Sequence, residues 1–316
     1  MRIGAIGAGR WGRNVVATLD GLGVLAAVAE PDEALRAAVH ARHPGAELFA
    51  HHLDLLERPL DAVAIATPAA THFRIARDAL LAGKDVFVEK PMTVSAAEAA
   101  ELTRLAAGLG RVLMVGHLLL YQPAVQFLRQ FLEGGEAGEL YALHQVRRNL
   151  GTIRQQENAL FSLGVHDLAV FAHLVGEAPC GVQAVGQCVT APGREDEVAV
   201  HLRYPGGVQA HLTVSWLWPY KERRLVALAT RGALVYDELA QTVTLHRAYG
   251  LPDGSVRDEG QELLMQGAGE PLRLELQHFT ECVRTRGTPR SDGAQGLAVV
   301  GLMEQISAQL GGRVKV

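Results

Sequence analysis

The sequence is poor in cysteine, in aromatic residues and in net charge, and it contains no long uninterrupted apolar run. Its three cysteines, Cys180, Cys188 and Cys282, form no C-x-x-C pair and no His/Cys metal pattern, so we expect free thiols, no metal site and a reducing, cytoplasmic location. The apolar segment 112–120 is short and is interrupted by His117, so we expect no membrane span.

The charge balance and the length restrict the class of protein further. A formal net charge of −4 gives no electrostatic reason to expect nucleic acid as a partner. With 48% hydrophobic and 20% charged residues, the composition is that of a soluble globular enzyme, and 316 residues suit two domains. The chain opens directly on a strand-like run, residues 2–6, so we expect no signal peptide.

A glycine motif lies between the first predicted strand and the first predicted helix. Gly7, Gly9 and Gly12 form G-x-G-x-x-G, a pattern that becomes informative in this context. The first glycine permits a tight turn, the second lets the backbone approach a pyrophosphate, and the third lets the helix pack on the strand. The helix N-terminus then offers free N–H groups to phosphates. The alternative is a glycine-rich turn without a ligand.

Glu30 ends the second predicted strand, residues 24–29, at the spacing expected for an acid that binds the adenosine ribose. A carboxylate there accepts hydrogen bonds from the ribose hydroxyls and repels a 2′-phosphate, and no basic residue follows until Arg36. The pattern therefore favours NAD over NADP. The alternative is a solvated acid at the end of the strand.

Strands and helices alternate as far as residue 116, which predicts right-handed βαβ crossovers and a parallel sheet. One short apolar strand, 86–88, continues directly into Glu89, Lys90 and Pro91. Ligands of parallel α/β sheets bind at the carboxyl ends of the strands. A lysine at such a place is either paired structurally or functional, and we favour a function for Lys90. His72 follows another strand end and is either near the cofactor or structural.

The second half of the chain reads differently. Strand-like runs follow one another with few helices between them, which predicts an antiparallel sheet with one face to cover. We therefore predict an α/β protein with an N-terminal Rossmann dinucleotide-binding domain, residues 1–119, and a C-terminal α/β domain, residues 120–316, with a large, mostly antiparallel sheet. The C-terminal helices are expected to pack back on the domain junction.

Asn158, Ser162 and His166 recur every four residues, so a helix would align them on one face. A histidine that only packs in the core is the alternative interpretation of this segment.

Three segments, residues 7–12, 64–72 and 82–92, carry a resemblance to a known family when they are taken together in this order. The chain resembles the glucose–fructose oxidoreductase/inositol dehydrogenase/rhizopine-catabolism (Gfo/Idh/MocA) family, whose members oxidise or reduce a hydroxyl of a sugar, inositol or nucleotide sugar. The resemblance implies that Lys90 is the catalytic lysine, that the Lys90–Pro91 peptide is cis, and that His166 accepts a proton. The family usually has Asp four residues before this histidine, where this chain has Ser162, so either Asp167 or a substrate group compensates or the catalytic role has weakened.

The resemblance also implies which residues surround the ligands. Those expected at the cofactor are Gly7, Gly9, Arg10, Trp11, Gly12, Glu30, Thr67, Pro68, His72, Glu89 and Lys90. Those expected at the substrate are Lys90, Tyr121, Arg148, Asn149, Arg154, Ser162, His166 and Asp167. The family's second domain commonly pairs with another subunit through its sheet, so a homodimer or homotetramer is expected.

Within the family, residues 116–124 and 148–154 look most like UDP-N-acetylglucosamine 3-dehydrogenases. Arg147, Arg148 and Arg154 could neutralise a UDP pyrophosphate, or they could be exposed residues at a strand end. Two other functions stay open: a family dehydrogenase for a free sugar, inositol or dihydrodiol, and a non-catalytic NAD-binding sensor or regulator.

Overall fold

The computed structural model describes residues 1–155, 157–267 and 269–311. The chain divides into two compact units. The first combines residues Met1–Leu118 with Glu270–Gly301, and the second combines Leu119–Gly269 with the chain from Leu302 onward. Among the described residues, no helix has both the length and the apolar character that crossing a membrane requires.

The first unit is built on a six-stranded parallel sheet in the order β3-β2-β1-β4-β5-β6. Its strands are β1 (Ile3–Ile6), β2 (Leu25–Ala29), β3 (Glu47–Phe49), β4 (Ala62–Ile65), β5 (Asp85–Glu89) and β6 (Leu113–Gly116). The strand order reverses between β1 and β4, and this is where a doubly wound sheet opens a crevice for a ligand. The predicted parallel sheet of the Rossmann domain is confirmed.

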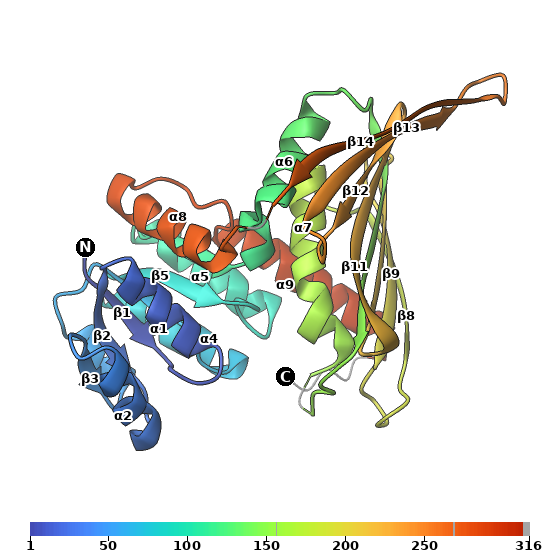
Figure 1. Cartoon of the computed structure of the whole chain (residues 1–316). Coiled ribbons are helices and arrows are strands. Elements are labelled where there is room, and N and C mark those ends of the chain that lie inside the picture. The colour runs from blue at the N-terminus through green and yellow to red at the C-terminus, as the bar shows by residue number, and fades with distance from the viewer. Residues whose placement is uncertain (156, 268, 312–316) are drawn as a thin grey trace. The chain divides into compact units, whose positions relative to one another are not determined.

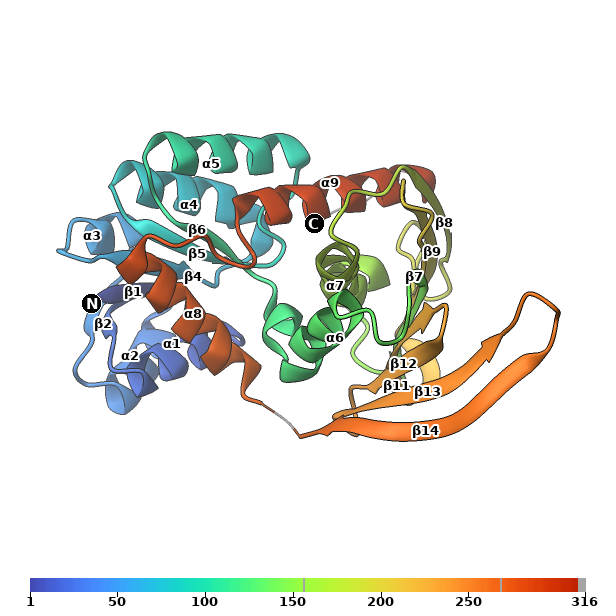
Figure 2. The same ribbon diagram turned by 90° about the horizontal axis from the view of Figure 1, so that it is seen from above.

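Helices cover both faces of this sheet (Figure 2). The helices are α1 (Gly12–Gly21), α2 (Glu33–Arg42), α3 (His52–Leu56), α4 (His72–Leu81), α5 (Ala96–Gly108), α8 (Pro271–Thr285) and the first part of α9 (Gly293–Gln309). In Figure 2, α4 and α5 lie on one side of the strands, and α1 and α8 lie on the other. The strands are buried on both faces; for example, Val63, Ile65, Val86 and Val88 are fully buried. Each such side chain contributes about 1.5–3 kcal/mol to folding.

Residues 270–301 belong to the first unit, whereas the prediction placed them in the C-terminal domain. The reason is packing against β5 and β6. The rings of Phe87 and Phe279 lie 5.8 Å apart, Arg286 Nη1 is 2.6 Å from Asp85 Oδ2, and Ser291 Oγ donates a hydrogen bond to the carbonyl of Val115. The C-terminal helical segment thus returns to the dinucleotide-binding sheet, on which α8 forms part of the outer layer.

The second unit contains an eight-stranded sheet in the order β14-β13-β12-β11-β7-β10-β9-β8. Its strands are β7 (Leu140–Leu150), β8 (Gly181–Gln187), β9 (Glu197–Arg203), β10 (Gln209–Ser215), β11 (Leu217–Ala229), β12 (Gly232–Asp237), β13 (Thr242–Gly250) and β14 (Val256–Gln266). All neighbours are antiparallel except β7 and β10. The predicted large, mostly antiparallel sheet is confirmed.

Helices α6 (Pro123–Glu133) and α7 (Val165–Val175) lie on one face of this sheet (Figure 1). Burial alternates along the strands as a one-sided sheet requires; in β10, Ala210, Leu212 and Val214 face the helices and are buried, whereas His211 and Thr213 face the other way. In the same figure β13 and β14 run on as a two-stranded arm beyond the other strands.

Candidate active site

The glycine loop between β1 and α1 is shaped by contacts that exclude side chains. Gly7 has φ +94°, and a Cβ there would lie 2.8 Å from the carbonyl oxygen of Ala66. A Cβ on Gly12 would lie 2.2 Å from the carbonyl oxygen of Gly7. By contrast, a Cβ on Gly9 would meet no atom within 4 Å. The loop is therefore tight against its own strand ends and open at Gly9, the position at which a pyrophosphate would approach.

Glu30 is held at the end of β2 by the loop itself. Its Oε2 accepts a hydrogen bond from the backbone N–H of Ala8 at 2.7 Å, and its Oε1 accepts one from Asp32 N–H at 3.1 Å. Arg36 reaches back and donates from Nη1 to the carbonyls of Glu30 and Pro31. The carboxylate thus sits beside the glycine loop.

These residues fit a dinucleotide. The N-cap of α1, Trp11, makes no side-chain capping bond, and the first turn carries no acid, so the positive end of the helix is not neutralised locally. Arg10 is exposed beside this turn. The open backbone at Gly9 and this helix end would hold the pyrophosphate, and Glu30 would be the acid for the adenosine ribose at the same end of the sheet.

Lys90 follows β5 directly, and its peptide bond to Pro91 is cis, as the family resemblance implies. The preceding residue, Glu89, is 8% exposed. Oε1 of Glu89 accepts a hydrogen bond of 2.5 Å from the indole Nε1–H of Trp11, and Oε2 accepts one of 3.3 Å from the backbone N–H of Lys90. Glu89 therefore links the start of α1 to the strand end that carries the lysine.

The electrostatics of this strand end are unusual. Burial raises the pKa of Glu89 to about 7, although the hydrogen bond from Trp11 and the charge of Lys90 act in the opposite direction. His117, one residue after β6, is buried; burial and the charge of Lys90 lower its pKa to about 3, so its imidazole is neutral. Neither ring nitrogen of His117 has a hydrogen-bond partner among the described residues.

His72, expected at the cofactor or in a structural role, is 1% exposed at the start of α4. Its Nδ1 lies 2.8 Å from the carbonyl oxygen of Pro91, and its Nε2 lies 2.8 Å from that of Thr67. Burial lowers its pKa. His72 thus ties the segment after β4 to the segment after β5. Thr67 and Pro68, predicted at the cofactor, lie on the first of these segments, where Thr71 Oγ1 hydrogen-bonds to both residues.

In the second unit, His166 lies in the first turn of α7 and is half-buried, as is Ser162. Residues Leu160–Gly164 form a π-helical turn that leads into α7, so a spacing of four does not follow a regular α-helix here. Asn158 lies just before this turn: its Oδ1 accepts a hydrogen bond from Phe161 N–H at 3.1 Å, and its Nδ2 donates one to Glu195 Oε2 at 2.8 Å.

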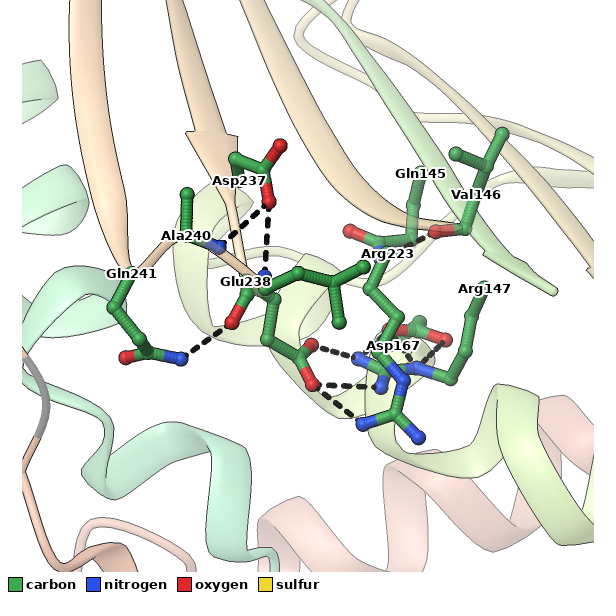
Figure 3. A network of polar contacts seen from close by, with 10 residues as sticks. Gln145, Val146, Arg147, Asp167, Arg223, Asp237, Glu238, Ala240 and Gln241 are labelled. Carbon is green, nitrogen blue, oxygen red and sulfur yellow. Dashed lines mark hydrogen bonds and ion pairs between the residues drawn. The ribbon is translucent and has the colours of Figure 1, made fainter. Parts of the chain in front are cut away.

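Asp167 is 1% exposed and is bound by Arg147, which is itself buried (Figure 3). Arg147 Nε lies 3.0 and 2.9 Å from the two carboxylate oxygens of Asp167, and Nη2 lies 2.9 Å from Oδ1. The guanidinium also binds Glu238, which Arg223 binds from the other side at 2.8 Å. The charges of Asp167 and Arg147 are therefore paired with other side chains of the protein.

The remaining residues expected at the substrate are distributed over the second unit. Arg148, on β7, pairs with Glu222 at 2.8 Å, and its guanidinium carbon lies 3.7 Å from the ring centroid of Trp218. The neighbouring Asn149 is half-buried. Arg154 lies 3.8 Å from Glu157, and Tyr121 is buried at 2% exposure.

Sequence reasoning missed two buried titratable groups of the first unit, His117 and Glu275. His117 stands one residue after a strand, the same signal that identified Lys90. Glu275 shares the buried face of α8 with Leu276, Phe279, Cys282 and Val283, so a carboxylate takes a place in an apolar stripe. An acid at an apolar position of the helix pattern is the sequence signal that could have identified Glu275.

A parallel sheet in the order 3-2-1-4-5-6, with a glycine loop after its first strand and an acid after its second, defines the class of dinucleotide-binding α/β proteins. Residues 1–117 match the family described as the Gfo/Idh/MocA oxidoreductase family with an NAD-binding Rossmann fold, and residues 125–235 match the Gfo/Idh/MocA C-terminal domain. The chain belongs to the Gfo/Idh/MocA family of NAD-dependent oxidoreductases. The resemblance noted in the sequence is thereby confirmed.

Known relatives span nearly the whole chain. A UDP-N-acetylglucosamine 3-dehydrogenase from Acidithiobacillus ferrooxidans is 30% identical over 312 residues, which cover 97% of this chain and 96% of the relative. A scyllo-inositol 2-dehydrogenase (NAD(+)) from Bacillus subtilis is 28% identical over 92% of this chain and 88% of its own. A solved structure of the Acidithiobacillus enzyme superposes with a TM-score of 0.88 and covers 98% of this chain and 97% of its own, at 28% identity.

Proposed function

We propose that the chain oxidises the C3 hydroxyl of a UDP-N-acetylhexosamine to a ketone with NAD as the hydride acceptor. The observation that carries this proposal is the similarity to a UDP-N-acetylglucosamine 3-dehydrogenase over almost the full length of both chains. In this proposal the substrate is a nucleotide sugar.

Lys90 and His166 are the two groups to which we assign chemistry. Bound NAD supplies the acceptor for the hydride at nicotinamide C4. His166 takes the proton of the sugar hydroxyl, because an imidazole is the side chain best suited to accept a proton near neutral pH. Lys90 stabilises the negative charge that develops on the oxygen as the hydride leaves. Removal of such a group from a dehydrogenase is expected to lower kcat by about 10²–10⁴-fold.

The ion pair between Asp167 and Arg147 bears on the role of Ser162. Asp167 is already bound by Arg147, so its charge is not available to hold an imidazolium at His166. Ser162 has no charge, and we therefore assign the compensation to the substrate itself. A diphosphate is the part of a nucleotide sugar that carries negative charge.

Arg148, Asn149, Arg154 and Tyr121 are proposed as substrate-binding residues. Arg148 is the best supported of these because Glu222 and Trp218 hold its guanidinium in place, with about a fifth of the side chain exposed. A guanidinium that is already ordered loses little side-chain entropy when it binds a phosphate.

A second candidate function is favoured by the scyllo-inositol 2-dehydrogenase relative at 28% identity. In this alternative the same Lys90 and His166 act on a free cyclitol or sugar, and the arginines of the second unit have no phosphate to bind. A non-catalytic NAD-binding sensor is the remaining alternative, and Ser162 is the residue that favours it.

The test is NADH formation, followed by absorbance, with UDP-N-acetylglucosamine, UDP-N-acetylgalactosamine, scyllo-inositol, myo-inositol and free N-acetylglucosamine as separate substrates. We expect NADH formation with a UDP-N-acetylhexosamine and none with the inositols or the free sugar. Lys90→Ala should abolish it while NAD still binds. Lys84→Ala is the matched control, since Lys84 precedes the same strand and donates to the carbonyls of Arg58 and Leu60. Activity with inositols only would overturn the proposal of a nucleotide-sugar substrate. If calorimetry shows that the protein binds NAD and yet none of these substrates is oxidised, the result would favour the sensor.

We further propose that the chain is a cytoplasmic homodimer or homotetramer that pairs through the face of the eight-stranded sheet opposite α6 and α7. Val226 on β11 lies on that face, opposite His144 of β7 in the strand register. Val226→Asp should dissociate the oligomer in light scattering coupled to size exclusion. An unchanged mass would contradict this mode of assembly.

A further inference from the structure

Glu275 is a buried acid to which the proposed reaction gives no role. It lies on α8 at 0% exposure, within the apolar stripe that packs against the dinucleotide-binding sheet. Among the described residues, no group donates a hydrogen bond to either of its carboxylate oxygens. A carboxylate ion in such surroundings would cost several kcal/mol of solvation free energy, so the group is present as the neutral acid.

The packing of α8 on β5 shows which side chain Glu275 faces. Phe87 and Glu89 are two residues apart on β5 and share one face of the strand. Phe279 and Glu275 are four residues apart on α8 and share one face of the helix. The two phenylalanine rings are in contact, with centroids 5.8 Å apart. Arg286 pairs with Asp85 at the start of β5, whereas Phe279 meets Phe87 further along, so α8 runs antiparallel to β5. Two residues of a strand and four of a helix advance by similar lengths, about 6–7 Å, so the next pair along this contact is Glu89 with Glu275.

Electrostatics agree with this pairing. Burial raises the pKa of Glu275 well above its ordinary value, and the charge of Glu89 adds to this effect. Two acids that share one buried site cannot both be ionised, and the proton stays on the more deeply buried one. Glu275 is fully buried, whereas Glu89 is bound by Trp11 N–H and by the backbone N–H of Lys90, both of which favour its ionised form.

We propose that Glu275 is a positioning residue: as a neutral acid it donates its proton in a hydrogen bond to the carboxylate of Glu89 and so holds Glu89 against Trp11 and Lys90. The pair then carries a single negative charge, which balances the ammonium of Lys90. Only the consequence for turnover rests on the proposed function; the protonation and the hydrogen bond do not depend on it.

The other titratable groups near the pair are Lys90 after β5, His117 after β6 and His72 at the start of α4. Burial and the charge of Lys90 keep both histidines neutral at pH 7. From α1, the indole of Trp11 faces Glu89. A titration with a midpoint near pH 7 in this cluster is therefore assigned to the ionisation of Glu89, whose pKa is raised to about 7.

Trp11 offers a direct readout of that ionisation in the full chain without any substrate. The protein is labelled with 5-fluorotryptophan, and the fluorine resonance of Trp11 is assigned by its loss in Trp11→Phe. Its chemical shift is followed against pH in the native chain, where a midpoint at about 7 is expected. Glu89→Gln should remove the transition. The resonances of Trp216 and Trp218 report that each variant is folded.

Two variants of Glu275 separate the possible roles. Glu275→Gln keeps an N–H donor without a titrating proton, so the midpoint should stay close to that of the native chain. Glu275→Leu removes the donor, and the loss of one hydrogen bond to a charged group should raise the midpoint by about one to two pH units. The acid limb of kcat/KM for whichever substrate is turned over should move in the same direction in Glu275→Leu.

The opposite results overturn the proposal. If Glu275 were ionised, both variants would remove a negative charge and the Trp11 midpoint would fall in both. If Glu275 only packed against the sheet, Glu275→Leu would leave the midpoint unchanged. Because the titration uses no substrate, a chain that fails to oxidise any UDP sugar would refute the proposed function while the titration still decides the role of Glu275.

Discussion

The buried ion pair between Arg147 and Asp167 leads to a prediction about stability that can be worked out from its contacts. Arg147→Met would leave Asp167, at 1% exposure, without the guanidinium that supplies its three close contacts. Burial raises the pKa of Asp167 and Arg147 opposes this, so removal of Arg147 forces the acid toward its neutral form. Removal of one partner of a buried pair typically costs about 3–5 kcal/mol, and we expect a loss in this range.

The double variant Arg147→Met/Asp167→Leu should recover most of that loss. It replaces both charges by apolar side chains of similar volume, a change that is often neutral or stabilising for buried pairs. Glu238 keeps Arg223 as its partner at 2.8 Å, so no carboxylate is left alone. We therefore expect the double variant to lie within about 2 kcal/mol of the native chain, with a coupling free energy of several kcal/mol between the two sites.

Urea unfolding measures these free energies. Trp216 and Trp218 both belong to the second unit, so their fluorescence in a Trp11→Phe background follows the unit that contains the pair. The control is Arg257→Met in the same unit, which removes the pair with Glu259, in which both side chains are more than two fifths exposed. No measurable change in the urea midpoint is expected for this surface pair. Single variants that each cost less than about 1 kcal/mol, or a double variant equal to their sum, would refute the reasoning.

Three further predictions concern the first unit. Glu30→Gln should weaken NAD binding by about tenfold, because a charge-assisted hydrogen bond is lost, and should improve the binding of NADP relative to NAD. Fluorescence titrations measure both affinities, and equal affinities in the native chain and the variant would contradict the role of Glu30. Arg286→Ala leaves the buried carboxylate of Asp85 with only the backbone N–H of Val112 as a donor. We expect a loss of about 1–3 kcal/mol in unfolding free energy, and an unchanged urea midpoint would refute this expectation. Burial and Glu89 raise the pKa of Glu275 above its ordinary value of 4.5, so the unfolded chain releases that proton first and native stability falls as pH rises above this value. Glu275→Leu should remove up to about 1.4 kcal/mol of this loss per pH unit. Parallel curves of unfolding free energy against pH for the two chains would count against a buried neutral acid.

Much of the first unit could be predicted because its signals are local. The glycine loop, the acid after the second strand and the alternation of strands with helices each occupy a few consecutive residues, and the parallel topology follows from connection rules. The place of Lys90 directly after a strand was predictable for the same reason, since a strand that ends in a charged residue is visible in a short window. That residues 270–301 belong to the first unit could not be predicted from a local pattern, because it depends on contacts of α8 with β5, some 190 residues earlier.

The buried charges were harder to predict. Arg147 reads as a surface cation in a pair with Arg148, and only the inward parity of β7, in which Leu143 and Gln145 are also buried, places it inside. Glu275 reads as one of several acids in an amphipathic helix. In both cases the partner lies far away in sequence, Asp167 after 20 residues and Glu89 after 186, so no local pattern could reveal the pairing.

The two buried charge clusters differ in how completely they are satisfied. In the second unit Arg147 and its acids exchange hydrogen bonds at nearly every polar atom, which is what a cluster that stabilises a fold requires. Beside the carboxyl ends of β5 and β6, by contrast, no described residue hydrogen-bonds to the ring nitrogens of buried His117, and none donates a hydrogen bond to Glu275 on α8. The carboxylate of Glu89, at the end of β5, has a raised pKa. Such groups cost stability and persist where an activity needs them. His117 and Glu89 both interact electrostatically with Lys90, so buried groups of this kind lie at the strand end to which we assign the proposed chemistry.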